Sequence, residues 1–374
     1  MQLLYRNVDG LDVSFQGCMP HDVLQALTAG KARAQRQRQE ALVELGPKRI
    51  PVHVAESGMK GGYAFRFDTG PFGATWAVAD SMDPERWNIR ASVHSLALAQ
   101  CGYEGAKQQL IGLLNDLCAV GQGDNLPNER ISRFDFCVDI ATPFFQPILD
   151  HVVCHSRMTR QVYHSLESQT VARGKRIESV MIGKMPGRQL VIYDKTREVV
   201  AHEKPYWWDF WGLDKRTYRG EVWRIEVRAG KDELDNWNIR TFGQLEHVAA
   251  NLTLTTLNNI RYTMPTNDRE ASRWPDHPLW LIAREAAEDG LAAYTSAATR
   301  GKVLAILRAQ AVEHFRSLFP GLLASYGHLR GLPVEDLPGI VALVGSEVRQ
   351  YAERNPRAMA EKFRRAAERY ALLR

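Results

Sequence analysis

The chain has 374 residues, of which 45% are hydrophobic and 24% charged, proportions that fit a folded globular protein and exclude wholesale disorder. Its formal net charge of +5 is compatible with a nucleic-acid partner but does not require one. The 5 cysteines are dispersed, and neither a signal-peptide pattern nor a membrane-spanning apolar run occurs. We therefore expect a cytoplasmic protein with no membrane contact.

The first half of the chain predicts an antiparallel sheet with packed helices. We expect a strand at 11–17 and a helix at 20–45. Four short alternating runs follow between 51 and 94, with glycine or proline between them, and these are typical of strands. A leucine repeat with helical spacing at 106–120 predicts an amphipathic helix that packs on the sheet.

The second half predicts a similar outline. Its expected elements are a strand at 131–140, a helical stretch near 145–157, strands in 178–184 and 188–195, a strand at 221–229 and a helix at 241–260. Two such groups predict an α+β fold, a duplicated antiparallel sheet with helices on one face. The other face of the sheet would then be free to bind a ligand.

Composition suggests how these parts divide into domains. The two halves, about 8–120 and 130–262, are expected to form one domain at 1–262. Residues 263–278 are rich in proline and polar side chains and predict a linker. Helical patterns dominate the remainder, so 279–374 is expected to be a helical C-terminal domain.

Three of the predicted strands carry polar residues on one face. These residues are Arg133, Asp135 and Asp139 on the first strand, Tyr193 and Lys195 on the second, and Arg224, Glu226 and Arg228 on the third. One interpretation is a solvated face with cross-strand ion pairs. The other is a phosphoryl-transfer site, in which carboxylates hold Mg²⁺ or Mn²⁺, arginines hold phosphate and a tyrosine acts as nucleophile.

Strand geometry separates the two aspartates. Asp135 and Asp139 are four residues apart, about 13 Å along a regular strand, so they cannot share one ion unless a bulge intervenes. Asp135 and Glu226, from paired strands, make the more plausible ligand couple. Asp139 would support the site or cap the strand end.

In order and spacing, "RISRFDFCVDI", "GRQLVIYDKTRE" and "WRIEVRA" resemble the three blocks of the Rep_trans family of rolling-circle replication initiators and related MOBT relaxases. The resemblance covers about residues 8–262. It implies an RRM/HUH-like palm and a nicking–joining endonuclease that forms a covalent 5′-phosphotyrosine. No His-x-His pair, the metal ligand of the larger class of rolling-circle nucleases, occurs in the chain, so carboxylates would replace it.

The resemblance also assigns roles to residues. Tyr193 would be the nucleophile and Lys195 its catalytic partner, and Asp135, Glu226 and Asp139 would hold Mg²⁺ or Mn²⁺. The expected DNA or phosphate contacts are Arg133, Arg224, Arg228, Lys184, Arg188, Trp208 and Arg216.

From these blocks we expect a rolling-circle replication initiator of a plasmid or phage-like element. Its partners would be origin DNA, with a double-stranded site and a single-stranded or hairpin nick region, and a host helicase and polymerase. A host helicase is expected because no phosphate-binding GxxxxGK[ST] loop occurs. A homodimer is left open.

Two alternatives remain at this stage. A MOBT-type conjugative relaxase of an integrative element would share the chemistry, but the strand expected at 11–17 leaves no room for the N-terminal helix-turn-helix domain of many relaxases. A non-cleaving origin-binding regulator would not need Tyr193, Lys195 and both acids together.

Three further features have structural and functional interpretations. His151, Cys154 and His155 could gather zinc on a helix, or be surface histidines around a buried cysteine. The aromatic residues in 204–219 could stack on bases or form core. The basic tail at 354–374 could follow phosphates, be a solvated helix face, or dock a partner.

Overall fold

A computed structural model describes the chain except residues 155–159, 164–176, 293–297 and 374. The chain divides into two compact units, Met1–Ala298 and Thr299–Arg374. Each unit is described by itself.

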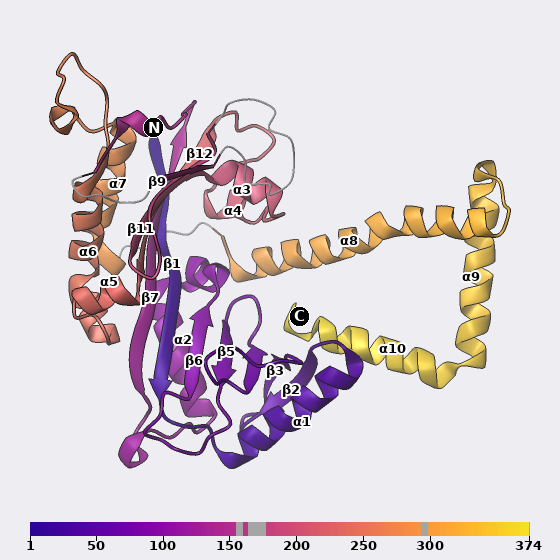
Figure 1. The fold of residues 1–374 in the computed structure, drawn as a ribbon. Helices are drawn as coiled ribbons and strands as arrows, with labels where there is room; N and C mark the ends of the chain where they lie inside the picture. The colour runs from indigo at the N-terminus through magenta and orange to yellow at the C-terminus, as the bar shows by residue number, and fades with distance from the viewer. Residues whose placement is uncertain (155–159, 164–176, 293–297, 374) are drawn as a thin grey trace. The chain divides into compact units, whose positions relative to one another are not determined.

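The first unit is built on a sheet that has eleven strands among the described residues (Figure 1). Their order is β2-β3-β4-β5-β6-β1-β7-β12-β11-β10-β9, and neighbouring strands run antiparallel. The strands are β1 Gln2–Gln16, β2 Ala41–Leu45, β3 Ile50–Val54, β4 Phe65–Asp68, β5 Ala74–Val78, β6 Ile89–Val93, β7 Asn128–Thr142, β9 Arg160–Tyr163, β10 Ser179–Gly183, β11 Arg188–Asp194 and β12 Glu221–Gly230. Outside this sheet, β8 Val152–Cys154 pairs with β13 Ile260–Tyr262.

The order of the strands repeats about the centre of the sheet. The long strands β1 and β7, the first of each half, pair with each other. The last strand of each half returns to pair with the first, β6 with β1 and β12 with β7. The predicted α+β class with a duplicated antiparallel sheet is therefore confirmed.

Helices cover the sheet unequally. The helices of the first unit are α1 His21–Gln37, α2 Ser95–Asp116, α3 Lys195–Ala201, α4 Trp207–Phe210, α5 Lys231–Asn236, α6 Phe242–Asn259 and α7 Pro278–Glu288. Apolar residues of α1, α2, α5, α6 and α7 share one continuous core with the sheet. Figure 1 shows the short helices α3 and α4 on the side of the sheet opposite α5, α6 and α7, so they are additional cover on the face expected to be free.

Strand β7 shows how the sequence divides the two faces. Phe134, Phe136, Val138 and Ile140 alternate along it and are buried in the helix-covered core. The polar residues between them point to the opposite face, as the period-two pattern predicts. Arg133, Asp135 and Asp139 of β7 therefore lie on the face of the sheet away from the main core.

Three sequence expectations need correction. The helix expected at 20–45 ends at Gln37, where Arg38 adopts a left-handed conformation, and β2 follows. The described part of 145–157 contains a 3₁₀ turn and β8, because Val152–Cys154 pairs with β13. The first strand begins at Gln2 and not at 11.

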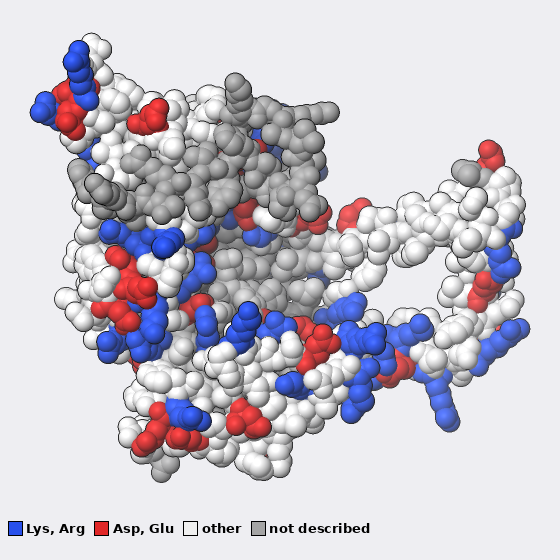
Figure 2. Space-filling view, in the orientation of Figure 1, with Lys and Arg blue, Asp and Glu red and all other residues white. Residues whose placement is uncertain are grey.

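Helix α7 begins at Pro278, close to the expected start of the helical region, whereas the second compact unit begins at Thr299. α7 belongs to the first unit because it packs on α6, where the indole of Trp280 donates a 2.9 Å hydrogen bond to the carbonyl oxygen of Leu257. The second unit contains α8 Arg300–Leu329, α9 Leu337–Arg354 and α10 Pro356–Arg369. Figure 2 shows basic side chains gathered over α10. No helix among the described residues is long and apolar enough to span a bilayer.

Candidate active site

The three polar strand faces predicted from the sequence come together in the sheet. β12 lies between β7 and β11, and Arg224 is in register with both Asp139 and Tyr193. Glu226 lies two residues after Arg224 on β12. Arg228 lies two residues further along and is in register with Asp135. The arrangement therefore brings the predicted site residues of three separate segments onto one surface.

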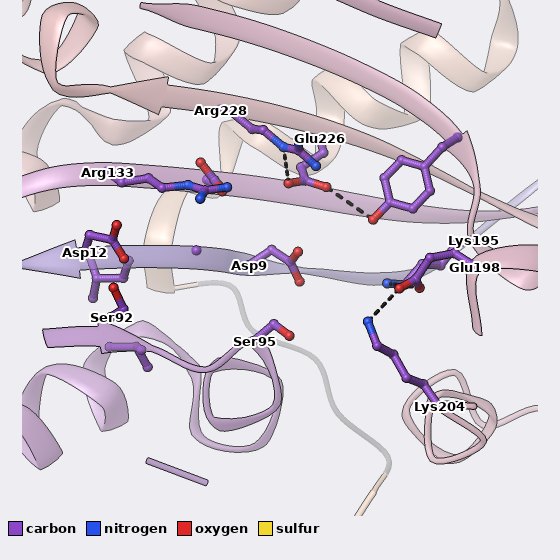
Figure 3. A pocket seen from close by; sticks show the side chains of 15 residues that line it. Asp9, Asp12, Ser92, Ser95, Arg133, Lys195, Glu198, Lys204, Glu226 and Arg228 are labelled. Carbon is purple, nitrogen blue, oxygen red and sulfur yellow. Dashed lines mark hydrogen bonds and ion pairs between the residues drawn. The ribbon is translucent and has the colours of Figure 1, made fainter. Parts of the chain in front are cut away.

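A cleft of about 420 Å³ opens on this surface (Figure 3). Its lining residues are Asp9, Gly10, Leu11, Asp12, Ser92, Val93, Ser95, Arg133, Asp135, Tyr193, Lys195, Glu198, Lys204, Glu226 and Arg228. Figure 3 shows Arg133 and Asp12 toward one end, Lys195, Glu198 and Lys204 toward the other, and Asp9 between them. Strands β1, β6, β7, β11 and β12 and helices α2 and α3 contribute residues to the cleft.

Asp135 is a buried carboxylate with one oxygen paired and the other unpaired. Nε and Nη2 of Arg133 lie 2.8 and 2.6 Å from its Oδ2. Oδ1 is also buried but has no hydrogen-bond partner among the described residues. Burial, opposed by Arg133 and assisted by the nearby charge of Glu226, raises the pKa of Asp135 to about 7. Either a proton or a cation beside Oδ1 would therefore supply the partner that this oxygen lacks among the described residues.

Glu226 connects the candidate nucleophile to an arginine. The hydroxyl of Tyr193 donates a hydrogen bond to Oε2 of Glu226 at 3.2 Å. Nε of Arg228 donates to Oε1 at 2.6 Å. Both oxygens of this buried carboxylate are thus held in place from either side.

Tyr193 is the next-to-last residue of β11, just before α3. β11 ends at Asp194, whose carboxylate caps α3 by accepting from the backbone amide of Arg197 at 3.1 Å. The tyrosine is only 8% exposed, yet it lines the cleft. Burial raises the pKa of its phenol well above 10, which the charge of Arg224 opposes and that of Glu226 reinforces. The phenol therefore keeps its proton unless additional positive charge approaches.

Lys195 and Lys204 share a carboxylate at the other end of the cleft. Nζ of Lys195 lies 2.7 Å from one oxygen of Glu198, and Nζ of Lys204 lies 2.6 Å from the other. Burial and the charge of Arg224 lower the pKa of Lys195. Burial opposes ionisation of Glu198, but the two lysines outweigh it and lower its pKa to about 2.

Arg224 and Asp139 form a buried ion pair beneath the cleft. Nε and Nη2 of Arg224 bind the two oxygens of Asp139 at 2.5 and 2.8 Å, and the indole of Trp211 donates to Asp139 at 2.8 Å. The guanidinium also lies 4.5 Å from the ring centre of Trp207. Since both side chains are fully buried and neither lines the cleft, this placement does not fit a DNA contact for Arg224 or a metal contact for Asp139.

Asp9 is a cleft residue that the sequence reasoning missed. In the pairing of β1 with β7, Val8 lies opposite Phe136 and Gly10 opposite Asp135, so Asp9 is an extra residue in a bulge. Its carboxylate accepts from Nη1 of Arg224 at 2.8 Å and is 15% exposed. The available signal was a break in phase, because the buried positions Val8 and Leu11 are three residues apart and not two.

The remaining predicted DNA contacts lie outside the cleft lining. Lys184 and Arg216 are exposed, and Arg188 lies 3.6 Å from Glu233. Trp208 is 8% exposed and packs edge to face against Trp211. With Tyr206, Trp207, Phe210 and Trp211 also buried, the aromatic segment forms core over the buried ion pair and offers little ring surface to a base.

The donor set for a metal consists of two carboxylates. Among the described residues, no group of three or more His, Cys, Asp or Glu side chains is arranged to hold an ion, and His155 of the zinc candidate lies outside them. Asp135 with its unpaired oxygen and the neighbouring Glu226 nevertheless fit a hard cation that completes its shell with water and phosphate oxygens.

Comparison with known proteins gives no family for the chain. No family model matches it, and no curated protein matches it. Among solved structures, a similar one is described as a rolling circle replication initiator protein from Geobacillus stearothermophilus, with a TM-score of 0.45 and 14% sequence identity. The match covers 78% of this chain and 99% of that chain. The likeness is too distant to assign a function to this chain.

Proposed function

We propose that the chain is a rolling-circle replication initiator that nicks and rejoins one DNA strand through Tyr193. The observation that carries the proposal is the hydrogen bond from the Tyr193 hydroxyl to Glu226, in a cleft that also contains an unpaired carboxylate oxygen and four cationic side chains. Cleavage of a phosphodiester by transesterification needs this combination of a nucleophile, charge stabilisation and proton transfer. The resemblance of three ordered sequence blocks to those of such initiators supports the same function.

Tyr193, Glu226 and Lys195 each have a role in the first transesterification. Tyr193 Oη forms a bond to the scissile phosphorus while the bond from phosphorus to the 3′ oxygen breaks. The phenol proton passes toward Glu226, which already accepts its hydrogen bond. Lys195, whose pKa burial and Arg224 lower, supplies a proton to the departing 3′ oxygen. The products are a 5′-phosphotyrosyl link and a free 3′ hydroxyl, and the reverse reaction joins the strand.

A divalent cation would be held by Asp135 and Glu226, and Mg²⁺ or Mn²⁺ suits these oxygen ligands. When bound, it would polarise the scissile phosphate and offset the charge that develops during transfer. Arg133 and Arg228, whose side chains are 40% and 25% exposed, would contact phosphate oxygens along the strand. Origin DNA would be the substrate, and the 3′ hydroxyl would prime a host polymerase behind a host helicase.

The covalent intermediate provides the direct test. Purified protein is incubated with Mn²⁺ and supercoiled DNA that carries the intergenic regions beside its own gene. We expect nicked circles and a protein–DNA adduct that is attached through the 5′ end, and we expect Tyr193→Phe to abolish both. Tyr206→Phe is the matched control, since Tyr206 is equally buried nearby but does not line the cleft.

The same assay separates the alternatives. A nick and an adduct that persist in Tyr193→Phe would refute the tyrosine assignment. Absence of any nick by the wild type, together with specific binding, would favour the origin-binding regulator. Cleavage at a conjugative transfer origin in place of a replication origin would favour the MOBT-type relaxase.

A further inference from the structure

On each of the two strands that carry a candidate metal ligand, β7 and β12, an arginine two residues away from the carboxylate binds it. On β7, Arg133 binds Asp135 through Nε and Nη2 at 2.8 and 2.6 Å. On β12, Arg228 binds Glu226 through Nε at 2.6 Å. Because residues two apart on a strand point to the same face, each arginine reaches its carboxylate directly over the sheet surface.

The two pairs lie side by side and form one cluster of four charges. Asp135 is in register with Arg228, and the charges of Asp135 and Glu226 each influence the other pair. The carboxylates are almost fully buried, whereas the arginines remain 40% and 25% exposed at the cleft. The arginines can therefore turn toward a ligand in the cleft while the carboxylates stay in place.

From this geometry we infer that Arg133 and Arg228 couple phosphate binding to cation binding by exchanging carboxylate for phosphate oxygens. Without DNA, the arginines neutralise Asp135 and Glu226 and repel a cation. A DNA phosphate that recruits the arginines releases both carboxylates for the cation, and a bound cation in turn releases the arginines for phosphate. The inference rests on the proposed function, which supplies the DNA and the cation as ligands.

Charge balance leads us to expect that each ligand alone binds weakly. A cation that enters the free cleft must displace two arginine–carboxylate pairs or sit beside both guanidinium groups. A phosphate that enters alone meets five cleft carboxylates, Asp9, Asp12, Asp135, Glu198 and Glu226. Together the two ligands bring opposite charges, so the pair restores neutrality. Linkage requires that each raises the affinity for the other by the same factor.

Binding without cleavage tests the coupling. In the full-length Tyr193→Phe protein, the affinity for a labelled single-stranded oligonucleotide of random sequence is measured by fluorescence anisotropy, with Mn²⁺ and with a chelator at equal ionic strength. We expect Mn²⁺ to tighten binding roughly tenfold, within the usual range for coupled sites. Adding Asp135→Asn should remove this effect, which separates it from general screening by the cation.

A second measurement uses the metal alone. Free Mn²⁺ is followed by electron paramagnetic resonance in Tyr193→Phe and in the same protein with Arg133→Gln or Arg228→Gln. We expect either substitution to tighten Mn²⁺ binding in the absence of DNA, because a competing cation has been removed, and to reduce the coupling factor. Arg130→Gln is the matched control, since Arg130 lies on the same strand with 32% exposure but pairs with Asp235 outside the cleft.

Equal oligonucleotide affinity with and without Mn²⁺ would overturn the coupling, as would unchanged or weaker Mn²⁺ binding in the arginine variants. These results are distinguishable from failure of the proposed function, because they are obtained in a protein that lacks the nucleophile. Nicking by the wild type without coupling would leave the tyrosine mechanism intact and remove only the exchange of partners.

Discussion

Gly10 lies so close to Asp135 that any side chain at position 10 would collide with the carboxylate. A Cβ atom on Gly10 would lie 2.4 Å from Oδ2 of Asp135 and 2.9 Å from its carboxyl carbon. The oxygen concerned is the one that Arg133 binds. The glycine of the first strand therefore sets the space in which a candidate metal ligand of the seventh strand is held.

Gly10→Ala should consequently displace Asp135 and separate it from Arg133. We expect a loss of about 1–3 kcal/mol in unfolding free energy, the usual effect of overpacking, and a loss of nicking. Chemical denaturation and the nicking assay measure the two effects. Gly112→Ala is the matched control: Gly112 lies within α2 with open space around it, so alanine should stabilise the protein by about 0.5–1 kcal/mol. Equal behaviour of the two variants would contradict the steric role.

Arg224→Met should be among the most destabilising single changes in the first unit. It leaves the buried carboxylate of Asp139 and the partly buried carboxylate of Asp9 without their guanidinium partner. Breaking a buried pair in this way costs about 3–5 kcal/mol, which urea unfolding would detect. Arg224→Lys should recover part of the loss because it keeps the charge but not the two-pronged contact. A loss no greater than that of the exposed control Arg216→Met would show that the ion pair does not hold the site together.

The raised pKa of Asp135 predicts a specific pH dependence. Its carboxyl has a pKa of about 7 in the folded chain but about 3.8 when unfolded, so the folded state favours the protonated form. Its contribution is intact below pH 3.8 and is lost as the pH rises toward 7, by up to about 1.4 kcal/mol per pH unit. Arg133, Arg228 and Glu226 are the charged groups that face it.

The matched variant for this prediction is Asp135→Asn, which cannot ionise. Between pH 4 and 7 the difference in unfolding free energy should move steadily in favour of the variant. Added Mg²⁺ together with a single-stranded oligonucleotide at pH 8 should raise the melting temperature of the wild type but not that of the variant. A constant difference across this range would mean that Asp135 is already ionised at low pH.

A second titration concerns His94 and Asp68, beside the cleft. Nε2 of His94 lies 3.1 Å from Asp68, and His94 precedes α2 and the cleft residue Ser95. Burial opposes the charge on His94, but Asp68 outweighs it and raises the pKa of His94 above 6.5. The stabilisation is present below pH 6.5 and is lost as the pH rises through the folded-state pKa. His94→Gln should remove about 0.5–1 kcal/mol at pH 6 and less at pH 9 in urea unfolding, whereas an equal loss at both would contradict the ion pair.

The sequence was sufficient to predict which face of the sheet carries the candidate site, but not every residue that lines the cleft. Strict alternation in β7, β11 and β12 placed Asp135, Tyr193 and Glu226 on one face, and the strands proved to be neighbours. Asp9 was not predicted as a site residue because its position depends on a bulge, which exists only through the pairing of β1 with β7. Strand β8 was not predicted because it forms by pairing with β13, which is distant in the sequence. The local apolar pattern around it favours a helix.

The alternating sequence pattern also could not predict how deeply each polar side chain is buried. Arg224 and Arg228 occupy equivalent places in the alternation, yet one is buried beneath Trp207 and the other reaches the cleft. The difference comes from α4, whose aromatic rings cover one end of the polar face and leave the other open. Only the three-dimensional position of that short helix distinguishes a structural arginine from one available to phosphate.

The pairing of β1 with β7 also has a consequence for synthesis on the ribosome. The first half of the chain can complete β1 to β6 before residues 128–142 emerge, and one side of the 15-residue strand β1 then has no partner. Such an open edge is prone to pair with strands of other chains. A fragment that stops before β7 should therefore self-associate, and extension through Thr142 should suppress this aggregation by completing the centre of the sheet.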